Sequence, residues 1–139
     1  MKLIEIDIRR ILNREKTLNY WGIGPYALEK SPPDPGRKML LEYCEEVEAA
    51  LKWLAGSAGY HRKTINRYHS SYGLKCIAEN MTGQYISNGA MITATLIMGF
   101  QYEIFHYGPN CCFNIHEKFI RLAEKKAAGA SIKRPFLWQ

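Results

Sequence analysis

The sequence predicts an α+β protein, mostly α-helical, that folds as a single domain over residues 1–139. Apolar residues recur with helical spacing in most segments. One short basic run has the two-residue alternation of a strand, and one aromatic stretch is divided by a glycine-proline turn. A chain of this length suits one hydrophobic core. We divide it into a helical extension (residues 1–57), a central core (60–100) and a hairpin followed by a basic helix and tail (101–139).

Helices are expected in the extension. Residues 3–20 place Ile4, Ile8, Ile11 and Leu12 on one helical face. The sequence SPPDPG at 31–36 predicts a rigid connector, since three of its six residues are proline. Residues 37–55 predict one continuous helix that ends before Gly56. Its expected exposed side carries Glu42, Glu45, Glu46 and Glu48.

The central core opens with the alternating run RKTINRY at 62–68, which predicts a strand. Successive side chains of a strand point to opposite faces. Alternation therefore places one set of residues on each face: Arg62, Thr64 and Asn66 on the first, and Lys63, Ile65 and Arg67 on the second.

Two helices are predicted after this strand. Ser70 or Ser71 can cap the first helix, Gly83 supplies a turn, and Ser87 or Asn88 caps the second. The second helix is apolar nearly all round, which predicts burial on several sides and is consistent with a dimer core. Amide groups at its start, near Gly89, lack intrahelical partners and would attract phosphate.

The C-terminal part predicts a β-hairpin over residues 101–115, turning at residues 108–110. A basic amphipathic helix is expected at 117–128. The tail, which ends in KRPFLWQ, carries aromatic residues that we expect to dock on this chain or on a protein partner.

Charge is distributed unevenly along the chain. Residues 1–57 hold nine Lys/Arg and nine Asp/Glu, whereas residues 58–139 hold ten and four, so the whole net charge of +6 lies in the second part. Such a basic half suggests a surface that faces a polyanion. No signal-peptide hydrophobic region and no run of about 18 apolar residues occurs, so a cytoplasmic protein without membrane contact is expected.

The segment LKCIAENMTGQYISNGAMITATLIMGF, with the alternating run before it, resembles the ribbon-helix-helix (Arc/MetJ-like) DNA-binding family over residues 62–100. This resemblance implies a homodimer that binds double-stranded DNA in a sequence-specific manner as a transcriptional regulator. Carried over by position, the DNA base contacts are Arg62, Thr64 and Asn66. The expected contacts to the DNA backbone are Lys63, Arg67, Lys75, Ser87, Asn88 and Gly89.

Two other functions remain open. In a winged-helix DNA-binding protein, the helices at 37–55, 71–81 and 87–99 would be followed by a wing at 101–115. Alternatively, a small protein-binding inhibitor or adaptor of a nucleic-acid-processing complex could use the C-terminal tail as its anchor.

We expect neither catalysis nor a cofactor or metal. The four histidines and four cysteines show no metal-binding spacing, and none of the cysteines forms a CxxC pair, which favours reduced thiols.

Overall fold

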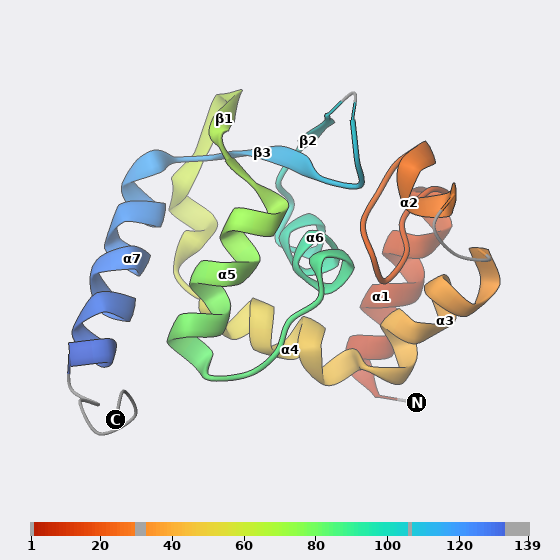
Figure 1. Cartoon of the computed structure of the whole chain (residues 1–139), viewed down its shortest axis with the longest axis horizontal. Helices are drawn as coiled ribbons and strands as arrows, with labels where there is room; N and C mark the ends of the chain where they lie inside the picture. The colour runs from red at the N-terminus through yellow and green to blue at the C-terminus, as the bar shows by residue number, and fades with distance from the viewer. Residues whose placement is uncertain (1, 30–32, 106, 133–139) are drawn as a thin grey trace.

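The computed structural model describes residues 2–29, 33–105 and 107–132 (Figure 1). The fold is α+β and mostly helical. Its elements, in chain order, are α1 (Leu3–Arg14), α2 (Pro25–Glu29), α3 (Pro33–Glu42), α4 (Cys44–Trp53), the 3-10 turn η1 (Ser57–Tyr60), β1 (His61–Ser70), α5 (Ser71–Thr82), α6 (Asn88–Ile97), β2 (Tyr102–Ile104), β3 (Cys111–Ile115) and α7 (Glu117–Ile132). No helix of the described residues is both long and apolar enough to cross a membrane.

The α6 helix lies at the centre of the molecule. Figure 1 shows it nearly end-on, with α5 and α1 on either side, α4 below and the sheet above. Every residue from Asn88 to Leu96 is buried. The predicted burial on several sides is thus confirmed, but the covering elements belong to the same chain. Burial of this helix therefore does not require a second copy of the protein.

The start of α6 has its caps and its cover within the chain. Ser87 is the N-cap, and its Oγ accepts a hydrogen bond from the Ala90 N–H at 3.0 Å. The Gly89 N–H donates to the Tyr20 carbonyl at 3.0 Å. A Cβ atom at Gly89 would overlap the carbonyl oxygen of Asn19, so glycine is required for this close approach. These amides are consequently not free to receive a phosphate, contrary to the sequence-based expectation.

The prediction of a single helix at 37–55 is wrong. Two helices, α3 and α4, meet at Tyr43, whose φ of −106° and ψ of 41° are not helical. Apolar periodicity continues across the break and no glycine or proline marks it, so the sequence pattern conceals it. The connector predicted at 31–36 is also wrong in its second half, because α3 begins at Pro33, a residue type suited to the first turn of a helix. Residues 31–32 lie outside the described residues.

The strand predicted at 62–68 is confirmed and extends over the whole of β1. It pairs antiparallel with β3, which also pairs with β2, so the sheet has the order β1-β3-β2. Pairing is irregular, with His61 opposite Ile115, Asn66 opposite Phe113 and Ser70 opposite Cys112. Strand β1 thus advances five residues and then four while β3 advances two and then one. Such bulges change the direction in which side chains point.

These bulges correct the predicted assignment of faces. Asn66 was expected on the outer face with Arg62 and Thr64, but only 1% of its surface is exposed. Thr64 is exposed and Arg62 is half-buried. Simple alternation fails here because it assumes an unbroken ladder, and β1 has two register shifts within ten residues.

The helix predicted at 3–20 is shorter than expected, because α1 ends at Arg14 and residues 15–20 are not helical. The two helices after β1, the C-terminal hairpin and the last helix are confirmed. Ser70 caps α5 by accepting a hydrogen bond from the Gly73 N–H at 3.1 Å, and Gly83, with φ of +70°, ends this helix. The C-terminal hairpin consists of β2 and β3, and α7 follows it. Buried apolar residues from α1, α3 to α7 and β3 form one core. The KRPFLWQ tail, residues 133–139, lies outside the described residues.

Replacement of Gly89 by alanine tests the close approach at the start of α6. We expect Gly89→Ala to lower the free energy of unfolding by about 3 kcal/mol or more, because the new methyl group overlaps backbone atoms that cannot rotate away. Gly73→Ala in α5 is the matched control. Its Cβ would meet only Ser70 Oγ, at 3.7 Å, so helix propensity should leave stability unchanged or raise it by up to about 1 kcal/mol. Equal stability of the two variants in urea unfolding would contradict the packing described here.

Candidate functional site

The residues predicted to contact DNA separate into two regions of the structure. Arg62, Lys63, Thr64 and Arg67 lie on β1. Lys75, Ser87 and Asn88 lie together around a pocket between α5 and the start of α6. Gly89 follows Asn88 but is covered by the backbone of residues 19–20. Asn66 also belongs to β1, but its side chain is buried.

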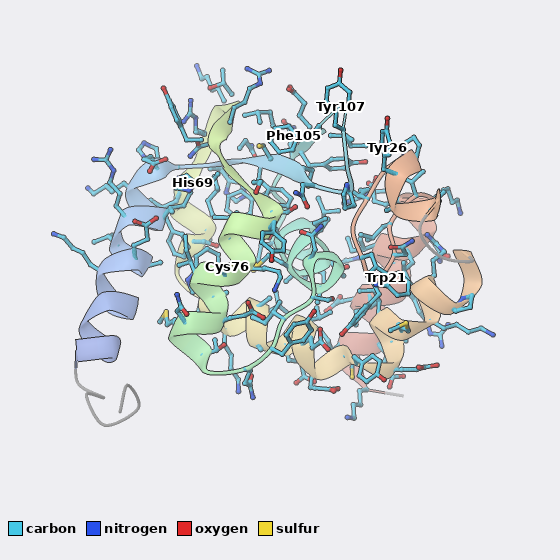
Figure 2. All side chains as sticks on the ribbon, viewed as in Figure 1. Trp21, Tyr26, His69, Cys76, Phe105 and Tyr107 are labelled. Atoms are coloured by element: carbon cyan, nitrogen blue, oxygen red, sulfur yellow. The ribbon has the colours of Figure 1, made fainter. Side chains whose placement is uncertain are left out.

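The first region, here called the β1–α7 surface, is strongly basic. Strand β1 and helix α7 together contain seven Lys/Arg and two Asp/Glu. Nitrogen-tipped side chains project from the upper end of β1 and from the outer side of α7 (Figure 2). The surface is defined by Arg62, Lys63, Arg67, Lys118, Arg121, Lys125 and Lys126.

Most of these cations have no carboxylate partner among the described residues. Arg67 forms a bidentate pair with Glu103, with N–O distances of 3.0 and 2.9 Å. Arg121 lies 3.7 Å from Glu117. The other five cations of the β1–α7 surface form no ion pair within the part of the chain that the structure describes. Tyr68, which is 90% exposed, stands among them on β1.

Glu117, the first residue of α7, joins this helix to β1. Its carboxylate accepts a hydrogen bond from Asn66 Nδ2 at 3.0 Å and lies 2.8 Å from His69 Nε2. Asn66 Nδ2 also donates to the Ile115 carbonyl at 3.2 Å. The Asn66 amide is therefore occupied in holding the sheet to α7 and is not available to a base edge. Arg62 donates to Thr64 Oγ1 at 2.9 Å, and both side chains stay at the surface.

The second region, here called the Lys75 pocket, is a cavity of about 220 Å³. In the view of Figure 2 its wall residue Trp21 lies between α6 and α3, on the side facing the reader. The pocket is lined by Tyr20, Trp21, Tyr72, Lys75, Tyr85, Ser87, Asn88, Pro109 and Asn110.

Among the described residues, Lys75 is the only cation of this lining, and 7% of its surface is exposed. Its Nζ donates to Glu79 Oε1 at 3.0 Å and lies 5.2 and 4.9 Å from the ring centres of Tyr72 and Tyr85. Burial lowers the pKa of Lys75, but the Glu79 carboxylate outweighs that effect and the net pKa is raised. The ammonium group is therefore charged at neutral pH, stabilised by a carboxylate and by two aromatic faces.

The carboxylates of Glu46 and Glu79 stabilise the chain around the pocket through hydrogen bonds. Glu46 accepts hydrogen bonds from the Ser87 N–H and the Tyr20 hydroxyl, both at 2.8 Å. Burial and this carboxylate raise the pKa of Tyr20 above its usual range. Glu79 Oε2 accepts from the Ile86 N–H at 3.1 Å. Both carboxylates thus anchor the chain that leads into α6.

Asn88 has one satisfied end and one unsatisfied end. Its Nδ2 donates to the Trp21 carbonyl at 3.0 Å and to Asn110 Oδ1 at 2.9 Å, with a longer contact of 3.3 Å to the Pro109 carbonyl. These three acceptors fix the orientation of the amide. Its Oδ1 is buried and has no hydrogen-bond partner. Asn88 is one of the residues that line the pocket, so this unpaired acceptor belongs to its wall, where the oxygen atom itself is buried.

Sequence reasoning missed most of this pocket. Glu46 was expected on an exposed helix face, yet only 8% of its surface is exposed. The aromatic wall comes from two distant parts of the chain, since Tyr20 and Trp21 are far in sequence from Tyr85. No local spacing in the sequence therefore indicates that these side chains meet.

Comparisons with protein-family models, with curated proteins and with solved structures find no match for this chain. Among the described residues, no group of three or more His, Cys, Asp or Glu could hold a metal ion.

The junction at Glu117 predicts an acid-sensitive contribution to stability. Burial raises the pKa of Glu117, but hydrogen bonds from Asn66 and His69 outweigh it, so the net pKa lies below the ordinary 4.5. A carboxyl group with a lowered folded-state pKa stabilises the fold fully above its unfolded pKa and loses this effect as pH falls through the folded value. We expect Glu117→Gln to be less stable than the natural chain near neutral pH, with the difference shrinking below pH 4.5. Urea unfolding across this range measures it, and a pH-independent difference would contradict it.

Proposed function

We propose that this protein binds double-stranded DNA through phosphate contacts made by the β1–α7 surface. The observation that supports this proposal is the group of five cations on two adjoining elements that no carboxylate of the described residues neutralises. Duplex DNA carries closely spaced negative charges, and lysine and arginine side chains that neutralise them release condensed counterions. Binding of this kind needs exposed cations, which both elements provide.

The geometry favours base contacts by fewer residues than the three that alternation predicts. Arg62 and Thr64 remain at the surface of β1, where arginine could pair with a guanine edge. Asn66 would have to break its bonds to Ile115 and Glu117 before it could reach a base. We therefore assign sequence discrimination to Arg62 and Thr64, and affinity to Lys63 and the cations of α7. A role in transcriptional regulation would follow from such discrimination.

Pairing of two copies through β1 is a further part of this proposal. Strand β1 lies at an edge of the sheet, with β3 on one side and no partner strand on the other among the residues that the structure describes. A ribbon-helix-helix dimer would form by antiparallel pairing along this edge. The two bulges of β1 reduce the length of regular edge available for such pairing.

A salt series distinguishes phosphate contacts from other modes of DNA binding. The logarithm of the binding constant should fall linearly with the logarithm of salt concentration. We expect Lys63→Gln and Lys125→Gln each to weaken binding on all duplex sequences and to reduce the magnitude of this slope by about 0.9. Lys38→Gln, an exposed lysine on α3 in the charge-balanced half, is the control and should leave the slope unchanged. Identical slopes for all three variants would refute the β1–α7 surface as the DNA contact.

Oligomeric state tests the pairing of two copies separately. At micromolar concentration, light scattering should give twice the mass of the chain. Ile65→Pro within β1 should return the protein to a monomer, because proline cannot donate a hydrogen bond to a partner strand. Ile65 is half-buried, so its replacement could disturb folding. Lys63→Pro, at an exposed position of the same strand, is therefore the second variant. If the natural chain is monomeric at this concentration, the dimer is excluded. The proposed phosphate contacts would still be tested by the salt series.

A further inference from the structure

We infer that the Lys75 pocket binds a single unpaired nucleobase, presented as a nucleotide. The pocket is built from α5, the start of α6 and residues 20–21 and 109–110, not from the β1–α7 surface, so this inference does not depend on the proposed DNA contact. It rests on three independent features of the pocket: its aromatic walls, its one buried cation and its one unsatisfied acceptor.

The walls of the pocket suit a planar ring. Trp21, Tyr72 and Tyr85 line it and are 37%, 54% and 62% exposed, so part of each residue is accessible to a ligand. Aromatic side chains bind bases by stacking, because every base has a π face. A cavity of about 220 Å³ is smaller than the usual site for a drug-sized ligand, which is roughly 300–1,000 Å³. Its size therefore suits one ring system and not an extended molecule.

The polar groups of the pocket match the edge and charge of a nucleotide. An ammonium group has three N–H donors, and Lys75 uses one of them on Glu79. Lys75 can therefore also donate to a phosphate or to a base carbonyl. Asn88 Oδ1 accepts no hydrogen bond from the part of the chain that the structure describes. The exocyclic amino group or ring N–H of a base is the kind of donor that this acceptor lacks.

Other ligand classes fit the same features less well. A metal ion would lie beside the Lys75 ammonium, and the carboxylates of Glu46 and Glu79 are already engaged by the protein. A methylammonium-type cation on Tyr72 and Tyr85 would lie beside the charged ammonium group of Lys75, which would repel it. An aromatic side chain of a peptide could fill the space, but a phenylalanine ring offers neither an anion for Lys75 nor a donor for Asn88.

Fluorescence of Trp21 provides a direct test. The full chain is titrated separately with AMP, GMP, CMP and UMP, with ribose 5-phosphate as a ligand that lacks a base, and with N-acetylphenylalanine amide as a ligand that lacks the polar edge. We expect saturable quenching by at least one nucleotide and none by the other two compounds. The signal should disappear in Trp21→Phe, which leaves the remaining tryptophans in place. Equal binding of ribose 5-phosphate, or binding of the phenylalanine amide alone, would overturn the inference.

Variants of two exposed tyrosines locate the bound nucleotide. Tyr85→Ala should weaken nucleotide binding roughly tenfold, because one stacking face is removed. Tyr68→Ala, an exposed tyrosine on β1 outside the pocket, is the matched control and should bind as the natural chain does. Unchanged binding by Tyr85→Ala would overturn the site. Lys63→Gln and Lys125→Gln should bind nucleotides normally, so a failure of the duplex DNA proposal and a failure of this site give different results.

Discussion

Closure of residues 19–22 over the start of α6 is the constraint on which the rest of the structure depends. Gly89 permits the backbone contact, its N–H bonds to the Tyr20 carbonyl, and Asn88 reaches the Trp21 carbonyl. Glu46 of α4 then binds both the Tyr20 hydroxyl and the Ser87 N–H. Three segments that are far apart in sequence are thus tied at one point. Because α6 is buried on all sides, the elements packed around it take their positions from this junction.

The same junction explains why two kinds of surface coexist on a small protein. It brings Tyr20, Trp21, Ser87 and Asn88 to one wall of the Lys75 pocket, where charge is balanced by nearby carboxylates. The cations of β1 and α7 lie on elements that the junction does not touch directly. Their charge is left mostly uncompensated among the described residues, which is unfavourable for an isolated fold but favourable when a polyanion is bound.

Local signals in the sequence were sufficient for most elements. Ser70, Gly83 and Ser87 are residue types whose capping or turn chemistry acts within a few positions, and each has the predicted role. The break at Tyr43 and the burial of Asn66 depend on distant partners, namely the packing of α4 against α6 and the register between β1 and β3. The sequence singles out Lys75, Ser87 and Asn88 as expected contacts to the DNA backbone, whereas no local pattern indicates the aromatic wall around them. Only the fold places Trp21 beside residues more than fifty positions away.

The two bulges of β1 leave several of its residues outside the regular pairing with β3. Pairing with β3 is fixed near His61, Asn66 and Ser70, and the residues between these positions outnumber those opposite them. Side chains such as Lys63 and Tyr68 are therefore attached to the sheet without being part of its ladder. We expect substitutions of the exposed residues between the three fixed positions to leave the register of β3 and the core beneath it intact. The side chains of the surface proposed for DNA contact could therefore change without rearrangement of the fold.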